Sequence, residues 1–327
     1  MKYLLLGIVL ALLIGVVNIA WLVFSPLASE QMVLKVAPGD NARAIATKLF
    51  DNGIIRSRRM FILMAKLRGT DRKLHAGAYS FGGYYDLNQT IALLEQGNTE
   101  SIRITFPEGM SLYKTLKRIE RSGLASYDSL YIAATDTAFV YRLTGFKAES
   151  LEGFLFPDTY RFGIGSSVES ILSAQVQEFF GQLNKAGIDP IQTKDFYRVL
   201  TLASIVEKES AHPDERVIIA GVFLNRMKIN MRLESCPTVD YILERRGVKR
   251  EVLTQMDINT PSPYNTYLKG GLPPSPICNP SLEAIRAVLK PAKSSYLYFV
   301  SNREGRNDFS SSYAEHLRKK HIYNRKR

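Results

Sequence analysis

The feature that most constrains this chain is an uncharged apolar segment near its N-terminus. Residues 3–24 read YLLLGIVLALLIGVVNIAWLVF, with Asn18 as the strongly polar exception. At about 1.5 Å per residue, a helix of this length spans the roughly 30 Å hydrocarbon core of a bilayer. The segment exceeds the roughly 7–15 apolar residues of a signal-peptide core, and the SPLASEQ that follows is a weak cleavage site. A retained membrane anchor is therefore favoured over a cleaved signal peptide.

The rest of the chain is expected on the outer side of that membrane. Lys2 alone marks the inside, but one N-terminal anchor ahead of a large soluble region most often sends that region outward. We thus expect a single-pass protein of the cell (inner) membrane. The formal net charge of +12 predicts an anionic partner. For a tethered chain, lipid headgroups and cell-wall polymer are favoured over nucleic acid, and a DNA-binding protein is the alternative that charge alone would suggest.

A strand-plus-helix pattern occurs twice in the first half of the chain. Residues 33–57 (VLKVAPGDNARAIATKLFDNGIIRS) predict a short strand, a Pro-Gly turn, an amphipathic helix and a glycine stop. Residues 103–126 (RITFPEGMSLYKTLKRIERSGLAS) repeat the pattern, with Gly39 matching Gly109. Residues 75–86 (HAGAYSFGGYYD) predict further strands between the two copies.

The second half predicts mainly helices joined by loops. Residues 151–167 read as a linker, and the turn-rich segment 259–281 has the length and composition of a functional loop. A strand is expected at 296–301. Helices are expected at 168–185, 194–210, 214–228 and 281–291. The predicted fold class is α+β.

Several chemistries are disfavoured by the motifs of the sequence. The four histidines lack metal-ligand spacing, and the sequence contains no HExxH, CxxC, GxSxG or Walker A motif. We therefore expect no metal and no cofactor. Cys236 and Cys278 are too few for a disulfide framework, and two free thiols are favoured.

Carboxylate chemistry remains, and the segment 203–210 (ASIVEKES) draws attention to it. Two glutamates end an otherwise apolar helix. On a helix, Glu207 and Glu209 point roughly 200° apart, so they cannot form a close pair and at most one faces a pocket. Periodicity does not choose between them, and both could be ordinary charges at a helix end.

A series of sequence blocks resembles the endolytic lytic transglycosylases of the MltG (YceG-like) family. The blocks keep their order over about half of the chain. They are LEGFLFPDTY (151–160), ASIVEKES (203–210), VFLNRM (222–227), MRLESCPTVDY (231–241), PSPYNTYLKGGLPPSPICNP (261–280), YLYFV (296–300) and FSSSYAEH (309–316).

The resemblance implies an enzyme, a carbon–oxygen lyase that acts on peptidoglycan. It would cleave the MurNAc–GlcNAc bond within nascent glycan strands without water, leave 1,6-anhydroMurNAc ends and terminate strand elongation. The family's catalytic glutamate falls on Glu207. Substrate-binding residues implied by the matching blocks are Glu152, Asn225, Thr238, Tyr264, Asn265, Thr266 and Tyr267. Glycan strands would be the main partner, with cell-wall synthesis enzymes as further partners.

The resemblance also implies a domain organisation. Residues 1–30 would form the anchor, residues 31–100 a small lysin-motif-like domain of strands and helices, and residues 101–327 a mixed α+β catalytic domain. Two positions depart from the family pattern: Cys236 stands where many members have aspartate, and Asn307 stands where histidine is common.

One carboxylate suffices for the implied reaction. A glutamic acid kept protonated by apolar surroundings can donate to the glycosidic oxygen and then take the proton of the C6 hydroxyl as that oxygen closes onto C1. The rival from another class is a non-catalytic, membrane-tethered peptidoglycan-binding scaffold, which would tolerate the loss of the Glu207 carboxylate.

Overall fold

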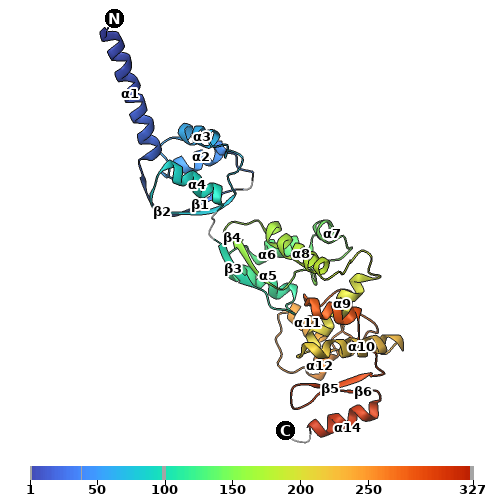
Figure 1. Ribbon diagram of the computed structural model, residues 1–327. Coiled ribbons are helices and arrows are strands. Elements are labelled where there is room, and N and C mark those ends of the chain that lie inside the picture. Colours follow the sequence, from blue (N-terminus) through green and yellow to red (C-terminus); the bar gives the residue numbers. More distant parts are fainter. Residues whose placement is uncertain (1, 38, 98–100, 325–327) are drawn as a thin grey trace. The chain divides into compact units, whose positions relative to one another are not determined.

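The computed structural model describes residues 2–37, 39–97 and 101–324, and it has the mixed α+β composition that the sequence predicts (Figure 1). The chain divides into two compact units. Unit 1 contains the described residues up to Arg103 together with Arg161–Ser166, and unit 2 contains Ile104–Tyr160 and the described residues from Ser167 onward. The boundary expected between residues 100 and 101 adjoins residues 98–100, which lie outside the described residues.

Helix α1 (Lys2–Phe24) begins unit 1, and its Leu6–Phe24 portion is long and apolar enough to cross a membrane. Its side chains from Leu6 to Trp21 are exposed, whereas Val23 is buried in the core of the unit. A signal sequence near an N-terminus shares these features, so the helix is one candidate span by length and composition.

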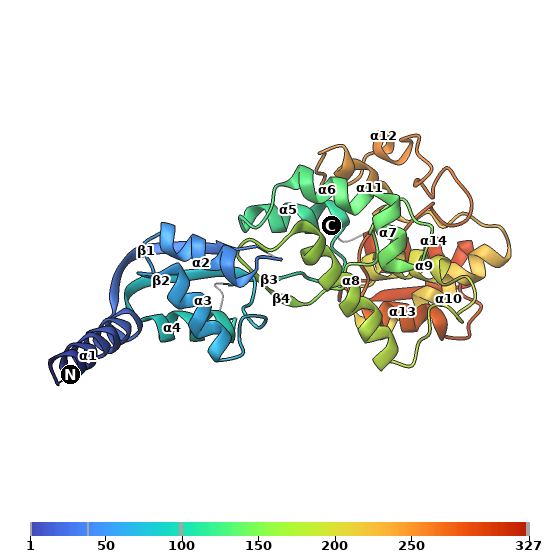
Figure 2. The ribbon, with the colours of Figure 1, turned by 90° about the horizontal axis from the view of Figure 1, so that it is seen from above.

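Unit 1 is a long strand pair covered by helices. Strand β1 (Leu27–Val36) pairs antiparallel with β2 (Gly77–Tyr85), with Leu34 opposite Tyr79. Figure 2 shows α2, α3 and α4 next to this pair. Their bounds are Ala42–Asp51, Arg58–Leu67 and Leu87–Gln96. Strand β1 and α2 confirm the first copy of the strand-plus-helix pattern. Residues 75–86 contain one strand, β2, rather than the several that were expected. Helices α3 and α4 were not predicted.

Unit 2 is built mainly of helices and contains one complete strand pair, in which β5 (Tyr298–Ser301) pairs antiparallel with β6 (Asn307–Ser310). Strands β3 (Ser101–Thr105) and β4 (Thr159–Gly163) also pair, and the division between the two units falls within both of these strands. The helices are α5 (Leu112–Arg121), α6 (Tyr127–Thr135), α7 (Thr137–Thr144), α8 (Val168–Lys185), α9 (Phe196–Glu209), the 3-10 helix Pro213–Glu215, α10 (Arg216–Lys228), α11 (Cys236–Arg245), α12 (Gln255–Ile258), α13 (Leu282–Leu289) and α14 (Tyr313–Asn324).

Helix α9 lies at the centre of unit 2. Its residues from Leu200 to Glu207 are all buried, and α10, α11 and α13 pack against it. This burial on every side fits residues 200–206 (LTLASIV), which carry no charged side chain. In the last turn of α9, Glu207 is therefore covered by other elements, whereas Lys208 is exposed.

The expectation of a linker at 151–167 is wrong. Leu151, Phe154 and Leu155 are buried, and the Phe154 ring packs edge-to-face on Phe179 with centroids 5.7 Å apart. The segment is core because its apolar residues are covered by distant elements. β4 then follows within the same stretch.

Candidate active site

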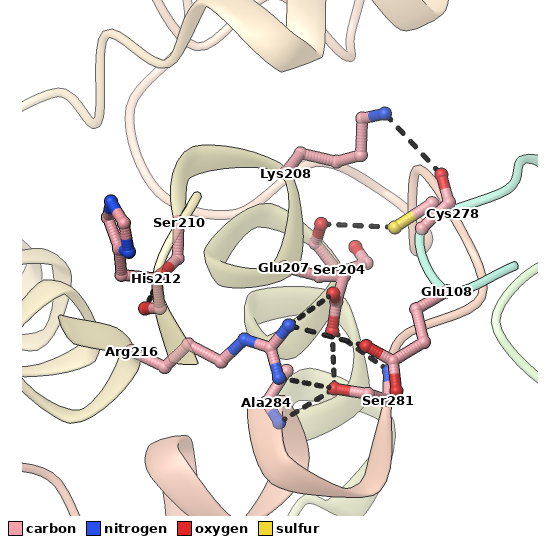
Figure 3. A network of polar contacts seen from close by, with 11 residues as sticks. Glu108, Ser204, Glu207, Lys208, Ser210, His212, Arg216, Cys278, Ser281 and Ala284 are labelled. Atoms are coloured by element: carbon pink, nitrogen blue, oxygen red, sulfur yellow. Dashed lines mark hydrogen bonds and ion pairs between the residues drawn. The ribbon is translucent and has the colours of Figure 1, made fainter. Parts of the chain in front are cut away.

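The Glu207 carboxylate lies at a junction of three helices in unit 2 (Figure 3). Its Oε1 atom accepts a hydrogen bond from Nη2 of Arg216 at 2.8 Å. Its Oε2 atom accepts two hydrogen bonds from Ser281, from the backbone N–H at 2.9 Å and from the hydroxyl at 2.5 Å. Because Ser281 caps α13, the N-terminal end of that helix faces the carboxylate, whereas α10 contributes the guanidinium of its first residue, Arg216.

The surroundings of this carboxylate correct the expectation of an apolar environment. Glu207 is 8% exposed, yet a guanidinium, a hydroxyl and a peptide N–H face its oxygens. A buried carboxylate requires such donors, because a charge removed from water must be paired and hydrogen-bonded. The donors hold the carboxylate in one position, as a group that reacts with a bound substrate requires.

A second carboxylate, that of Glu108, also contacts Arg216. Its Oε2 atom is 3.4 Å from the same Nη2 atom that contacts Glu207. Burial and, next, the negative charge of Glu207 raise the pKa of Glu108 above its usual range. Sequence reasoning missed this residue. The signal that was present is the FPEG turn of the second strand-plus-helix copy, where glutamate replaces the proline of the first copy.

Glu209 has separate partners, which confirms that the two glutamates do not form a pair. One of its oxygens accepts a hydrogen bond from the Ser235 hydroxyl at 2.6 Å, at the start of α11. Burial raises the pKa of Glu209 to about 7. Between the two glutamates, Lys208 is exposed and its Nζ atom donates to the carbonyl of Gly109 at 3.4 Å.

Glu152 and Tyr264 line a cavity of about 360 Å³ whose wall is rich in tyrosine. Glu152 is 2% exposed and accepts a hydrogen bond from the Leu112 N–H at 2.8 Å. Burial raises the pKa of Glu152 to about 8, so it is largely protonated at neutral pH. The other aromatic and charged members of the wall are Tyr113, Tyr127, Tyr131, Tyr241, Glu149 and Arg245.

A larger cleft of about 740 Å³ lies beside the end of α9. Gly109 and Lys208, which flank Glu207, line it together with Cys236 and Asp240. A Cβ atom on Gly109 would lie 3.5 Å from Cγ of Glu207, so the glycine brings the backbone close to the Glu207 side chain. Tyr113 and Tyr241 line both the cleft and the tyrosine-rich cavity.

Three of the predicted binding residues order the loop 259–281 through their own hydrogen bonds. The Nδ2 atom of Asn265 donates to the carbonyls of Ile258 and Thr260, each at 2.8 Å. The hydroxyl of Thr266 lies 3.0 Å from that of Thr238, which is buried on α11. These contacts fasten the loop to α11 and α12.

The remaining predicted residues lie at the edges of the site or away from it. The Tyr267 hydroxyl is 3.0 Å from Sγ of Cys236. Both cysteines are free, as expected; Cys236 is exposed and Cys278 is buried. Asn225 donates to the carbonyls of Ser294 and Tyr296, at 2.8 and 3.1 Å, so it joins α10 to the segment before β5 rather than to Glu207.

Asn307, the second departure from the family pattern, has a structural contact. It donates its backbone N–H and its side-chain Nδ2 to the carboxylate of Glu215, at 3.0 and 2.8 Å. Glu215 is buried directly before Arg216. Asn307 therefore fixes β6 to the segment that carries the arginine.

The fold and this site define an α+β protein with a carboxylate-centred site at the junction of α9, α10 and α13. Comparison with known proteins gives the family. Residues 34–322 match the model of the YceG-like family, so the chain belongs to that family, as the sequence blocks indicated.

Similar proteins share this assignment. The chain is 30% identical over 306 residues to a Bacillus subtilis (strain 168) protein named endolytic murein transglycosylase, covering 89% of this chain and 84% of that protein. It is 27% identical over 328 residues to a protein of the same name from Streptococcus pneumoniae serotype 2 (strain D39), covering 89% of this chain and 58% of the relative. A crystal structure of a YceG-like protein from Listeria monocytogenes matches with a TM-score of 0.60 at 30% identity, covering 88% of this chain and 98% of the other.

Proposed function

We propose that this protein is a membrane-tethered lytic transglycosylase that cleaves peptidoglycan glycan strands internally, with Glu207 as the catalytic acid and base. The observation that carries the proposal is the Glu207 carboxylate, buried at the end of a core helix and fixed by Arg216 and Ser281. Membership of a family whose relatives are named endolytic murein transglycosylase supports the choice of peptidoglycan as substrate.

The hydrogen bonds of Glu207 suggest which of its oxygens reacts. A carboxylate oxygen has two lone pairs, and those of Oε2 are both used by Ser281. Among the described residues, Oε1 accepts one hydrogen bond, from Arg216, which leaves its second lone pair unused. Oε1 is therefore the atom that we assign to carry the proton.

The reaction proceeds in two proton transfers through this atom. Protonated Glu207 donates to the oxygen of the MurNAc–GlcNAc bond, the C1–O bond breaks with its electron pair on the departing oxygen, and an oxocarbenium-like charge develops. The C6 hydroxyl of the same muramic acid then bonds to C1, and its proton returns to Glu207. The product is a 1,6-anhydroMurNAc end, and water takes no part.

The tyrosine-rich cavity and the neighbouring cleft are suited to the glycan strand and its stem peptides. Tyrosine presents an apolar ring face and a hydrogen-bonding hydroxyl, which match a sugar ring and its substituents. We assign Glu152 and Tyr264 to substrate contact at the cavity wall. The loop beside the cleft is ordered by Asn265, Thr266 and Tyr267, and Thr238 on α11 holds Thr266. Asn225 joins α10 to the segment before β5 and is assigned no contact with the glycan strand.

The N-terminal part would hold the enzyme beside newly made wall. Helix α1 acts as a retained single-pass anchor, the small strand-and-helix domain of residues 31–100 is lysin-motif-like, and residues 101–327 form the catalytic domain on the outer side of the membrane. Cleavage there would terminate elongating strands. Protease added to spheroplasts should digest residues 31–327, whereas protection of this region would contradict the outward orientation.

Mass spectrometry of cleaved sacculi tests the reaction. Full-length protein in detergent micelles should produce internal ends one water lighter than hydrolytic ends, and Glu207→Gln should abolish them. Glu209→Gln is the matched control, because it changes a glutamate two positions away that contacts Ser235 instead. Hydrolytic ends would indicate a hydrolase. Equal function of wild type and Glu207→Gln would favour a non-catalytic, peptidoglycan-binding scaffold.

A further inference from the structure

The two carboxylates that share Arg216 suggest a further role within the proposed reaction. We propose that Glu108 is a positioning residue whose carboxylate takes over the Arg216 guanidinium when Glu207 carries the proton. This inference rests on the proposed function of Glu207.

Arg216 is placed to serve two anions. Its Nη2 atom is 2.8 Å from Oε1 of Glu207 and 3.4 Å from Oε2 of Glu108, while Nη1 donates to the Ser281 hydroxyl at 3.0 Å. Glu108 and Glu207 are the carboxylates within 4.0 Å of this guanidinium among the described residues. A small shift of the guanidinium would therefore exchange the closer partner for the other.

Burial makes such a second anion necessary. Arg216 is 7% exposed, and its guanidinium stays charged at every physiological pH. If Glu207 alone faced it, protonation of Glu207 would leave a buried positive charge without a partner, which is strongly unfavourable. With Glu108 beside it, Arg216 keeps an anionic partner through the whole reaction.

The two carboxylates differ in exposure, and this difference assigns their roles. The Glu108 side chain is 51% exposed, so water stabilises its charge when Arg216 turns to Glu207. The Glu207 side chain is 5% exposed and depends on Arg216 and Ser281 for its charged form. Together the two carboxylates and one guanidinium carry a net charge of minus one, and a single proton neutralises the group.

The charged groups that face this cluster come from four elements. Arg216 belongs to α10, Glu207 and Lys208 belong to α9, and Glu283 on α13 adds a more distant negative charge at Glu108. Glu108 itself lies in the turn after β3. The partial burial of Glu108 and, next, the negative charge of Glu207 raise the pKa of Glu108.

The change of partner by Arg216 adds no proton to the reaction and removes none. The proton passes from Oε1 of Glu207 to the glycosidic oxygen as the C1–O bond breaks, and the proton of the C6 hydroxyl returns to Oε1 as the new C1–O6 bond forms. Glu108 neither gives a proton to the substrate nor takes one from it. It changes how readily Glu207 holds the proton that starts each turnover.

The pH dependence of cleavage tests this role. The full-length protein in detergent micelles is incubated with sacculi at pH values from 5 to 9, and the anhydro ends formed are counted. In Glu108→Gln, Arg216 has Glu207 as its remaining carboxylate, so Glu207 gives up its charge less readily. The alkaline limb of the rate profile should move to lower pH by about one unit, a loss of about tenfold in rate on that limb. Binding to sacculi should be unchanged.

Two further variants control for charge and for structure. Glu108→Asp keeps the anion and should return the alkaline limb toward its wild-type position. Glu169→Gln removes an exposed carboxylate in the first turn of α8 and should leave the profile unchanged. A thermal melt of each variant establishes that it is folded.

The outcomes separate the two proposals. If wild type makes no anhydro ends, the proposed function is overturned and this inference falls with it. If wild type cleaves, an unmoved alkaline limb in Glu108→Gln overturns the role of Glu108 alone. A uniform loss of rate at every pH in both Glu108→Gln and Glu108→Asp also overturns it, because that result would mean a purely structural contact.

Discussion

Ser281 donates two hydrogen bonds to one oxygen of Glu207, from its backbone N–H and from its hydroxyl. The same hydroxyl oxygen accepts from the Ala284 N–H at 3.2 Å and from Arg216 Nη1 at 3.0 Å. Its one proton and both of its lone pairs are thus used. The start of α13 and the position of the carboxylate therefore depend on the same atom.

Ser281→Ala should lower both stability and cleavage. The variant keeps the N–H but loses a hydroxyl bonded to a charged group, which is worth about 1.5–3 kcal/mol, so the rate of anhydro-end formation should fall about 10- to 100-fold. Loss of the helix cap should cost about 1 kcal/mol. Ser167→Ala is the control, because Ser167 caps α8 with a hydrogen bond from Ser170 N–H at 3.1 Å. Equal rates in the two variants would contradict a role for the Ser281 hydroxyl beyond capping.

Replacement by alanine should change the stability of the protein in opposite directions at two helical glycines. A Cβ on Gly221 in α10 would lie 2.7 Å from the backbone oxygen of Ala292, whose N–H donates to the Val217 carbonyl. Gly221→Ala should therefore destabilise the protein by about 1–3 kcal/mol. A Cβ on Gly181 in α8 meets no atom within 4 Å, and Gly181→Ala should stabilise the helix by about 0.5–1 kcal/mol. Thermal midpoints that move in the same direction would be inconsistent with this packing.

The buried acids predict a stability that falls as pH rises. The pKa of Glu152 increases from 4.5 to about 8 and that of Glu209 to about 7 on folding, so the folded state holds protons that the unfolded state releases. Below about pH 4.5 their favourable contribution to the free energy of unfolding is complete. It is lost as the pH rises to about 8 for Glu152 and to about 7 for Glu209, with a slope of at most about 1.4 kcal/mol per pH unit for each group.

Glu152→Gln should flatten this dependence, because glutamine can still accept from the Leu112 N–H and carries no proton to release. Thermal midpoints at pH 5, 6.5 and 8 provide the measurement. Glu169→Gln, on an exposed surface, should keep the wild-type slope. A wild-type midpoint that is the same at pH 5 and pH 8 would show that these acids are not held protonated.

Capping residues and glycines in the sequence correctly predicted helices that begin or end at such residues. Helix α8 has the predicted bounds, because Ser167 caps its start and Gly187 follows its end with a positive φ of 70°. The prediction for α9 is two residues too long at the start and one at the end. The pairing of β5 with β6 was not predictable from the sequence. Strand β6 has four residues of mixed polarity, and such a short segment forms a strand only when it pairs with a neighbour.

The candidate site was only partly predictable for the same reason. The divergence of Glu207 and Glu209 follows from helical geometry, but both are held by distant groups, so periodicity could not rank them. Ser281 is 74 positions from Glu207, and Arg216 is 108 positions from Glu108. Such contacts form only in the folded chain, so the glutamate of the FPEG turn marks a difference between the two strand-plus-helix copies but does not identify its partner.

Loss of the Asn279 side chain should disturb the turn that carries Glu108. It is 2% exposed; its Nδ2 donates to the Met110 carbonyl at 3.0 Å, and its Oδ1 accepts from the N–H groups of Gly153 and Leu155 at 2.9 and 3.0 Å. Asn279→Ala should leave these buried groups unpaired and destabilise the protein by about 2–4 kcal/mol. Asn302→Ala is the control, because Asn302 also accepts from two backbone N–H groups but is only half-buried, so water can replace it. A thermal midpoint that falls no further in Asn279→Ala than in Asn302→Ala would contradict the view that this asparagine joins the Glu108 turn to the core.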